Sequence, residues 1–279
     1  MISDEKKSNM FVKIKGRIHA KNLEETMKYA IVTGGAKGIG RCITEYMVND
    51  GYAVFIIDQD SEAGMQLTTR YGTDKCMFYP GDVANQMDLD GFISFVKEKT
   101  TSIDALINNA CISKGGLLRC SYEDFNYVLR VGVTAPFYLV QQLMTIFSKG
   151  ASIVNISSTR ATMSQPDTES YTSAKGGILA LTHGLSVSLS GKARVNSISP
   201  GWIDTAQYQY PKEVLTDYTV GDVKQHPAGR VGTPEDIAEM VLFLCSERAS
   251  FITGENITID GGMTKQMIYH NDCGWDYKG

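Results

Sequence analysis

The chain has 279 residues, 43% of them hydrophobic and 21% charged, a balance that is ordinary for one globular α/β domain with a substantial core. The net charge of −4 offers no basic face for a phosphate backbone, and no apolar run could span a bilayer, so we expect neither nucleic-acid nor membrane partners. The six cysteines form no Cys-x-x-Cys pair and the four histidines have no zinc-type spacing. This predicts reduced thiols, a cytoplasmic location and no metal site.

The first 27 residues mix basic and acidic side chains and lack the apolar core of a secretory signal. We therefore expect residues 1–27 to be an N-terminal extension, either a disordered lead or the product of an upstream start codon. The fold is expected to occupy residues 28–264. Nothing in the sequence marks a division of this stretch into two domains.

The first predicted element is a buried strand over 29–32, which is followed by a glycine turn and then by a helix over 41–49. Glycines let the backbone turn tightly and approach a pyrophosphate, while the start of the helix points free N–H groups at the phosphates. The order of strand, glycine turn and helix is the one that a dinucleotide site requires. The cofactor-binding residues predicted here are Gly34, Lys37, Gly38, Ile39 and Gly40.

The next predicted strand, over 53–57, ends at Asp58, twenty residues after Gly38. A carboxylate at this place accepts hydrogen bonds from both adenosine ribose hydroxyls and repels a 2′-phosphate, which favours NAD. Lys37 argues for NADP instead, because a cation in the glycine turn could pair with that phosphate. We expect NAD to be preferred and NADP to be the weaker cofactor, since the repulsion by Asp58 is direct.

Strands and helices then alternate to the end of the domain. The remaining strands are expected over 75–79, 105–107, 152–157, 194–199 and 256–259, and the helices over 60–70, 86–99, 122–147, 169–190 and 234–246. Repeated βα units predict a Rossmann-like, doubly wound parallel sheet with helices on both faces, which makes three layers in one domain. Ligands in such sheets bind at the carboxyl ends of the strands.

The pair Tyr171 and Lys175, with Ser158 thirteen residues upstream, carries the predicted chemistry. Residues four apart share one face of a helix, and an ammonium close to a phenol favours the phenolate. A serine hydroxyl near the same point can hold the substrate oxygen. The three residues therefore predict a device that moves a proton on and off a carbonyl or alcohol.

Two further regions are expected to govern substrate and assembly. The stretch 206–230, with Trp202 just before it, mixes aromatic and polar residues and is expected to be a lid, in which Pro211 and Lys212 open a short helix. The tail over 265–279 carries Met267, Tyr269, Trp275 and Tyr277, and we expect it to pack at a subunit interface.

Seven motifs in order resemble those of the short-chain dehydrogenase/reductase family, over almost the whole of 28–264. Besides the glycine turn and the Tyr171/Lys175 pair, they are Asp82-Val83, Asn108-Asn109-Ala110, 153–158, 199–205 and 259–262. The resemblance implies the Rossmann-like fold, a nicotinamide cofactor, a homotetramer or else a dimer, and Ser158, Tyr171 and Lys175 as catalytic residues. It also implies cofactor contacts by Asp82, Val83, Asn108, Asn109, Ala110, Tyr171, Lys175, Pro200, Gly201, Ile203 and Thr205.

One position departs from the family pattern. Gly132 stands where the family has an asparagine whose backbone carbonyl is understood to hold a water that links the lysine to solvent. Glycine keeps the carbonyl but loses the side chain that anchors the helix bend, and it increases backbone freedom. The alternative to an active enzyme is therefore a catalytically weakened dinucleotide-binding or regulatory protein of the same fold.

The function expected from these residues is hydride transfer between NAD(H) and a secondary alcohol or ketone, such as a steroid, a sugar or polyol, or a small carbonyl compound. Tyr171 is the expected general acid/base. A second rival is an epimerase or dehydratase that keeps NAD tightly bound. A serine hydrolase is the least favoured reading, because no Gly-x-Ser-x-Gly elbow surrounds Ser158.

Overall fold

A parallel sheet of seven strands forms the middle layer of the protein in the computed structural model, which describes residues 27–214, 217–267 and 269–272. The strands follow the order β3-β2-β1-β4-β5-β6-β7, and every neighbouring pair is parallel. The predicted fold class is confirmed. The predicted extension, except Met27, and the tail residues Trp275 and Tyr277 lie outside the described residues.

The central strands are largely apolar runs that are buried on both faces, as the strands of a covered parallel sheet are, whereas the last strand, β7, is partly exposed at the edge. They are β1 (Lys28–Thr33), β2 (Tyr52–Asp58), β3 (Cys76–Pro80), β4 (Ile103–Asn108), β5 (Phe147–Ile156), β6 (Ala193–Pro200) and β7 (Asn256–Ile259). The fully buried side chains of β1 and β2 alternate between the two cores on either side of the sheet. Ile31 and Phe55 belong to one core, and Val32 and Ile56 belong to the other.

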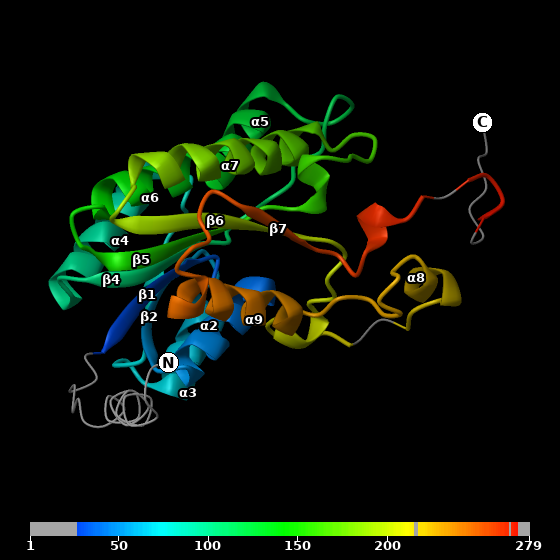
Figure 1. The fold of residues 1–279 in the computed structure, drawn as a ribbon. Coiled ribbons are helices and arrows are strands. Elements are labelled where there is room, and N and C mark those ends of the chain that lie inside the picture. The colour runs from blue at the N-terminus through cyan, green and yellow to red at the C-terminus, as the bar shows by residue number, and fades with distance from the viewer. Residues whose placement is uncertain (1–26, 215–216, 268, 273–279) are drawn as a thin grey trace, which may run out of the picture.

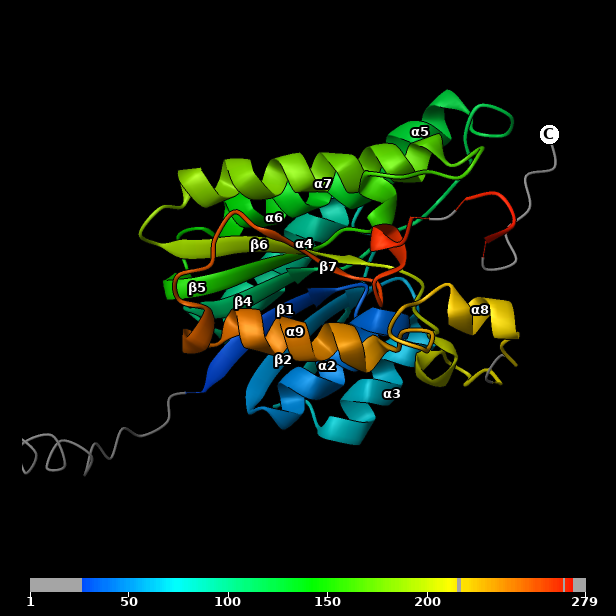
Figure 2. The ribbon, with the colours of Figure 1, turned by 45° about the vertical axis from the view of Figure 1, so that its right-hand side comes forward.

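Helices cover both faces of the sheet (Figures 1 and 2). One face carries α2 (Gly38–Asn49), α3 (Ser61–Tyr71) and α9 (Pro234–Cys245), and the other carries α4 (Gln86–Lys99), α5 (Tyr122–Leu129), α6 (Ala135–Leu143) and α7 (Glu169–Ser188). Two of these helices begin at capping residues: Asp60 accepts the N–H of Ala63 at the start of α3, and Thr233 and Asp236 make a capping box at the start of α9. None of these helices, nor any other in the described ranges, has the length and apolar character that a bilayer crossing requires.

Two sequence predictions about helices are wrong. The helix expected over 122–147 is divided by a π-helical turn at Arg130–Thr134, and it stops at Leu143. Its last expected residue, Phe147, instead opens β5, where it pairs with Ile103 of β4. The apolar character of Phe147 fits a buried strand as well as a helix, so the local pattern could not separate the two.

The short helix expected at Pro211 and Lys212 is the other error. There the chain turns back on itself, and the N–H of Glu213 donates to the carbonyl of Ala206. The short helix of this region is α8 (Val220–Lys224), because Thr219 and Asp222 form a capping box that satisfies the free N–H groups at its start.

The order of the strands indicates which edge of the sheet binds ligands. From β1 the chain proceeds outward to β2 and β3, and it then returns to the other side of β1 to add β4, β5, β6 and β7. The carboxyl ends of β1 and β4 therefore flank the point at which the order reverses, which is where open α/β sheets bind ligands. The glycine turn, Asn109 and Ser158 follow strands at this edge, and Asp58 is the last residue of β2.

Candidate active site

The glycine turn brings the backbone of β1 very close to the loop after β4. Gly34 and Gly38 have φ angles of +62° and +58°, a region that glycine adopts without steric cost. A Cβ on Gly40 would lie 2.0 Å from the carbonyl oxygen of Gly34 and 2.4 Å from Nδ2 of Asn109. Helix α2 begins at Gly38 with no side-chain cap, so its first N–H groups remain available for an anion.

Above this turn lies a cavity of about 470 Å³, which we call the glycine-turn cavity. It is lined by most of the predicted cofactor residues, namely Gly34, Lys37, Gly38, Ile39, Asp58, Val83, Asn109, Ala110 and Thr205. The close backbone approach, the uncapped helix start and the size of the cavity fit a dinucleotide. The described residues include no group of three or more His, Cys, Asp or Glu that could hold a metal ion.

Asp58 is fixed in this cavity by its own backbone surroundings. Its Oδ2 accepts the N–H of Ala36 at 3.0 Å, and its Oδ1 accepts the N–H of Asp60 at 3.0 Å. The neighbouring Lys37 forms an ion pair with Asp60, in which Nζ lies 2.8 Å from Oδ2. The Lys37 ammonium lowers the pKa of the Asp60 carboxyl, and the hydrogen bond to Asp60 raises the pKa of Lys37.

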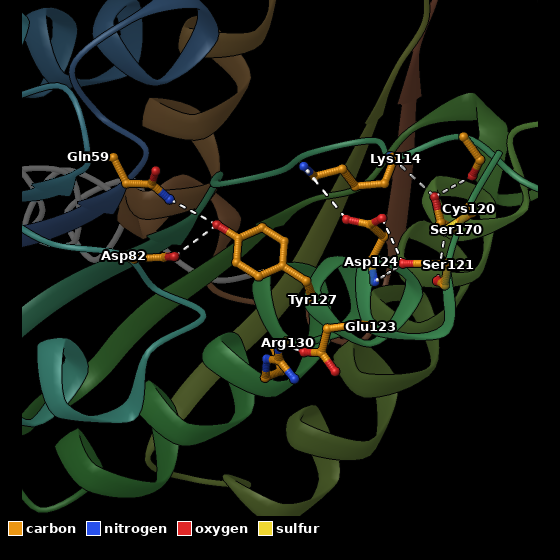
Figure 3. A network of polar contacts seen from close by, with 11 residues as sticks. Gln59, Asp82, Lys114, Cys120, Ser121, Glu123, Asp124, Tyr127, Arg130 and Ser170 are labelled. Atoms are coloured by element: carbon orange, nitrogen blue, oxygen red, sulfur yellow. Dashed lines mark hydrogen bonds and ion pairs between the residues drawn. The ribbon is translucent and has the colours of Figure 1, made fainter.

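A hydrogen-bonded tyrosine closes one side of the glycine-turn cavity, and sequence reasoning missed it (Figure 3). The hydroxyl of Tyr127, on α5, donates to Oδ2 of Asp82 at 2.8 Å and accepts from Nε2 of Gln59 at 3.1 Å. Burial, together with the hydrogen bond to Asp82, raises the pKa of Tyr127. Asp82 itself does not line the cavity, since its carboxylate is occupied by Tyr127 and by the N–H of Ala84.

Ser158 and Tyr171 line a second cavity of about 520 Å³, which we call the Ser158 cavity. Ser158 follows β5, and its Oγ accepts the N–H of Arg160 at 3.2 Å. Gly201 and Ile203, two of the predicted cofactor contacts, lie on the wall of this cavity rather than of the first. Thr205, two residues further on, lines the glycine-turn cavity, so the segment after β6 contributes to both.

Lys175 is buried directly beside the phenol ring of Tyr171. Its Nζ lies 5.4 Å from the ring centroid and donates to the carbonyl of Ile156 at 2.7 Å. Only 3% of Lys175 is exposed, and it lines neither cavity. The structure therefore brings the three predicted catalytic residues together, with Ser158 and Tyr171 on the wall of the cavity and the Lys175 ammonium close to the Tyr171 ring.

A chain of buried polar side chains connects the centre of the sheet to α7. Nδ2 of Asn108 donates to Oδ1 of Asn155 at 2.8 Å, and Nδ2 of Asn155 donates to Oγ1 of Thr182 at 2.9 Å. Asn108 is thus turned toward β5 and lines neither cavity. Pro200 also lines neither, since it is buried at the end of β6. These contacts fix the position of the helix that carries Tyr171 and Lys175.

Gly132 lies in the π-helical turn and packs against α7 next to Lys175. A Cβ on Gly132 would lie 2.8 Å from the Cβ of Ala174, closer than real side chains approach. The bend that the sequence analysis expected to lose its anchor is present as the π-helical turn. The glycine is therefore matched to the close approach of the two helices.

The predicted lid holds its aromatic side chains in specific contacts. The ring of Trp202 lines the Ser158 cavity and meets the ring of Tyr218 edge to face at 5.9 Å. Tyr218 donates to Asp204, and Tyr208 donates to Oε1 of Glu235 at 2.8 Å. The same cavity is lined by Gln225, which lies in the predicted lid, and by Arg160 and Gln165, which sequence reasoning missed. The position of Arg160 two residues after Ser158 was the only sequence signal for these two.

The fold and the site define a Rossmann-like oxidoreductase. Over residues 34–264 the chain matches the protein family described as Enoyl-(Acyl carrier protein) reductase. It is 42% identical over 255 residues to a protein of Thermotoga maritima named "Uncharacterized oxidoreductase", and the match covers 87% of this chain and 98% of that one. It is 33% identical over 245 residues to the 3-oxoacyl-(acyl-carrier-protein) reductase FabG of Chlamydia pneumoniae, with 85% and 97% of the two chains covered.

A solved structure described as an apo SCOR enzyme from Clostridium thermocellum superimposes with a TM-score of 0.82. It is 42% identical to this chain, and the match covers 91% of this chain and 99% of that one. The chain belongs to the short-chain dehydrogenase/reductase family, as the order of its motifs predicted.

Proposed function

We propose that the protein transfers a hydride between NAD(H) and a secondary alcohol or ketone. The observation that carries this proposal is the arrangement of Ser158, Tyr171 and Lys175: hydroxyl and phenol share one cavity, and the ammonium lies 5.4 Å from the phenol ring. The segment from Ile203 to Thr205 passes from that cavity to the glycine-turn cavity. A substrate in one cavity and a dinucleotide in the other would meet along this segment.

In the proposed reaction Tyr171 gives a proton to the substrate oxygen during reduction and takes it back during oxidation. The Ser158 hydroxyl holds that oxygen by a hydrogen bond. The Lys175 ammonium stabilises negative charge on the phenol oxygen, and its hydrogen bond to Ile156 holds it in place for this role. When bound, the nicotinamide supplies or accepts the hydride at C4.

The proposed preference for NAD follows from the anchored carboxylate of Asp58. Both of its oxygens are held by backbone N–H groups, so it cannot easily turn away from a 2′-phosphate. The ammonium of Lys37, which would attract that phosphate, is already paired with Asp60. Titration with NADH and with NADPH checks the preference, and tighter binding of NADPH would contradict it.

Replacing Tyr171 by Phe tests the proposed role of the phenol. The variant keeps the ring beside Lys175 but loses the proton donor, so we expect kcat to fall by roughly 100-fold or more, because general acid catalysis contributes about 10²–10⁴-fold. The affinity for NADH should change little, since Tyr171 does not line the glycine-turn cavity. Near-normal turnover by this variant would assign the proton transfer to another group.

The alternative is a dinucleotide-binding or regulatory protein with weakened catalysis, and Gly132 is the observation that favours it. The packing against Ala174 argues for the active enzyme, because an asparagine at Gly132 would push on the helix that carries Lys175. We expect wild-type turnover with a panel of ketones and a lower rate for Gly132→Asn. A wild type without turnover, and a variant that gains it, would support the binding protein.

The proposed assembly is a homotetramer, with a dimer as the alternative, in the cytoplasm. In the described part of the tail Met267 and Tyr269 are 76% and 66% exposed in the single chain, as an uncovered interface would be. Light scattering of the full chain and of a form ending at residue 264 checks the role proposed for residues 265–279. Equal masses would place the interface elsewhere.

A further inference from the structure

The Ser158 cavity contains a cation and no carboxylate among the described residues that line it. Arg160 is the charged side chain, and the other lining residues are neutral: hydroxyl and amide side chains together with Met163, Gly201, Trp202, Ile203 and Met263. No ion pair within the described ranges joins Arg160 to an Asp or Glu. Arg160 therefore contributes a positive charge to the cavity wall that has no ion-pair partner among the described residues.

The guanidinium of Arg160 is held close to the proposed reaction centre. Its Cζ lies 5.9 Å from the centroid of the Tyr171 ring, and one of its nitrogens donates to Oε1 of Gln165. A guanidinium has five N–H donors in a planar fork, so this hydrogen bond leaves donors for a second partner. A carboxylate fits such a fork with two parallel hydrogen bonds.

We propose that the substrate is an oxo acid, or the matching hydroxy acid, whose carboxylate is bound by Arg160 a few bonds from the reacting carbon. This inference rests on the proposed function and names its substrate class. In the reducing direction the carbonyl carbon receives a hydride from the reduced nicotinamide, and the carbonyl oxygen receives the proton of Tyr171. The C=O bond becomes CH–OH, the cofactor is oxidised, Tyr171 regains a proton from water, and the carboxylate is unchanged.

The position of Arg160 over the Tyr171 ring suggests a competing role. A cation over a phenol ring acts on the ring itself, so Arg160 could serve the phenol rather than the substrate. In that case every substrate would depend on Arg160 to the same degree. Recognition of a carboxylate instead predicts that only acids depend on it.

The test compares each acid with its neutral ester. Acetoacetate and 2-oxobutyrate, and the methyl ester of each, are reduced with NADH by the wild type, by Arg160→Gln and by Arg160→Lys. We expect the wild type to prefer the acids, and Arg160→Gln to lower kcat/KM for the acids by roughly 10- to 100-fold while changing the esters less than about threefold. Arg160→Lys should fall between the two, because it keeps the charge but not the fork.

The matched control is Arg248→Gln, which removes the same charge from a residue that lines neither cavity, and it should leave both substrate types unchanged. Binding is read independently by quenching of tryptophan fluorescence, because Trp202 lines the cavity. Acetoacetate should quench the wild type at lower concentrations than Arg160→Gln, and a Trp202→Phe variant should lose the signal. Thermal unfolding confirms that each variant is folded.

Equal rates with acids and esters in the wild type, or an equal loss for both in Arg160→Gln, would overturn the oxo-acid proposal and leave the oxidoreductase standing. Failure of the proposed function has a different signature: no carbonyl compound oxidises the cofactor, and neither pyridine nucleotide binds. In that case quenching by acetoacetate that depends on Arg160 would still support an anion site.

Discussion

The two cavities differ in the part of the chain that builds them. The glycine-turn cavity is lined mainly by residues at the carboxyl ends of four strands, β1 to β4, and it includes a glycine turn in which the carbonyl of Gly34 accepts from Nδ2 of Asn109. The Ser158 cavity is formed by side chains from the turn after β5, from α7, from the segment after β6 and from Met263. The first site thus depends on a close backbone approach at its glycine turn, and the second depends on the side chains that line it. The first suits a cofactor shared by many proteins, and the second suits a particular substrate.

The largest expected effect comes from Gly40→Ala, which tests whether the first cavity depends on the close backbone approach at the glycine turn. The added Cβ would meet the carbonyl oxygen of Gly34 at 2.0 Å, and backbone cannot move away as a flexible side chain can. We expect a loss of about 2–3 kcal/mol in the free energy of unfolding, which is typical of overpacking. The affinity for NADH, measured by calorimetry, should fall roughly tenfold or more, because a turn displaced by the methyl group no longer lets the backbone approach the pyrophosphate closely.

The matched control is Gly184→Ala in α7, where no atom lies within 4 Å of the added Cβ. Alanine there should stabilise the protein by about 0.5–1 kcal/mol through helix propensity, with no effect on NADH binding. Similar stabilities for the two variants would show that the glycine turn is less tightly packed than its geometry indicates.

A smaller effect is expected from Thr182→Val, which removes a hydrogen bond that holds α7 beside the Ser158 cavity. Valine keeps the shape of threonine but leaves Nδ2 of the fully buried Asn155 without an acceptor, at a cost of about 1–3 kcal/mol. Because Thr182 lies on α7 with Tyr171, we expect kcat to fall while the affinity for NADH changes little. Thr69→Val, on the exposed face of α3, is the control and should change neither quantity. Reduced NADH affinity in Thr182→Val would couple the two cavities.

The same contrast explains what the sequence could predict. The sheet, the order of its elements and the glycine turn follow from local patterns: apolar runs of strand length, glycines where φ is positive, and caps such as Asp60 and Thr233. The resemblance to the family added the expected roles of Ser158, Tyr171 and Lys175. The structure brings these three together, and their roles in catalysis stay predictions until the variants are measured.

The features that the sequence could not predict depend on contacts between distant segments. Tyr127 reaches Asp82 across 45 positions of the chain, and no spacing rule indicates such a pair. Gly132, in the π-helical turn, lies against Ala174 of α7, a residue far along the chain. Arg160 is a candidate for substrate binding only because the fold places its guanidinium close to the ring of Tyr171. Tertiary packing therefore determines these three features, whereas the start of α8 has a local signal, the capping box of Thr219 and Asp222, that sequence reasoning overlooked.

The smallest expected effects come from removing the N-terminal caps of two helices, α9 against the sheet and α8 in the predicted lid. Thr233→Ala removes the cap of α9, which buries Ile237 and Val241, and should cost about 1 kcal/mol in the free energy of unfolding. Thr219→Ala removes the same kind of cap from α8, a helix of five residues with none buried. Because such a segment can open without unfolding the core, we expect a change within about 0.5 kcal/mol in chemical denaturation. The KM of Thr219→Ala should rise modestly, because α8 directly precedes Gln225, which lines the Ser158 cavity. Equal destabilisation by Thr219→Ala and Thr233→Ala would instead show that α8 unfolds together with the core.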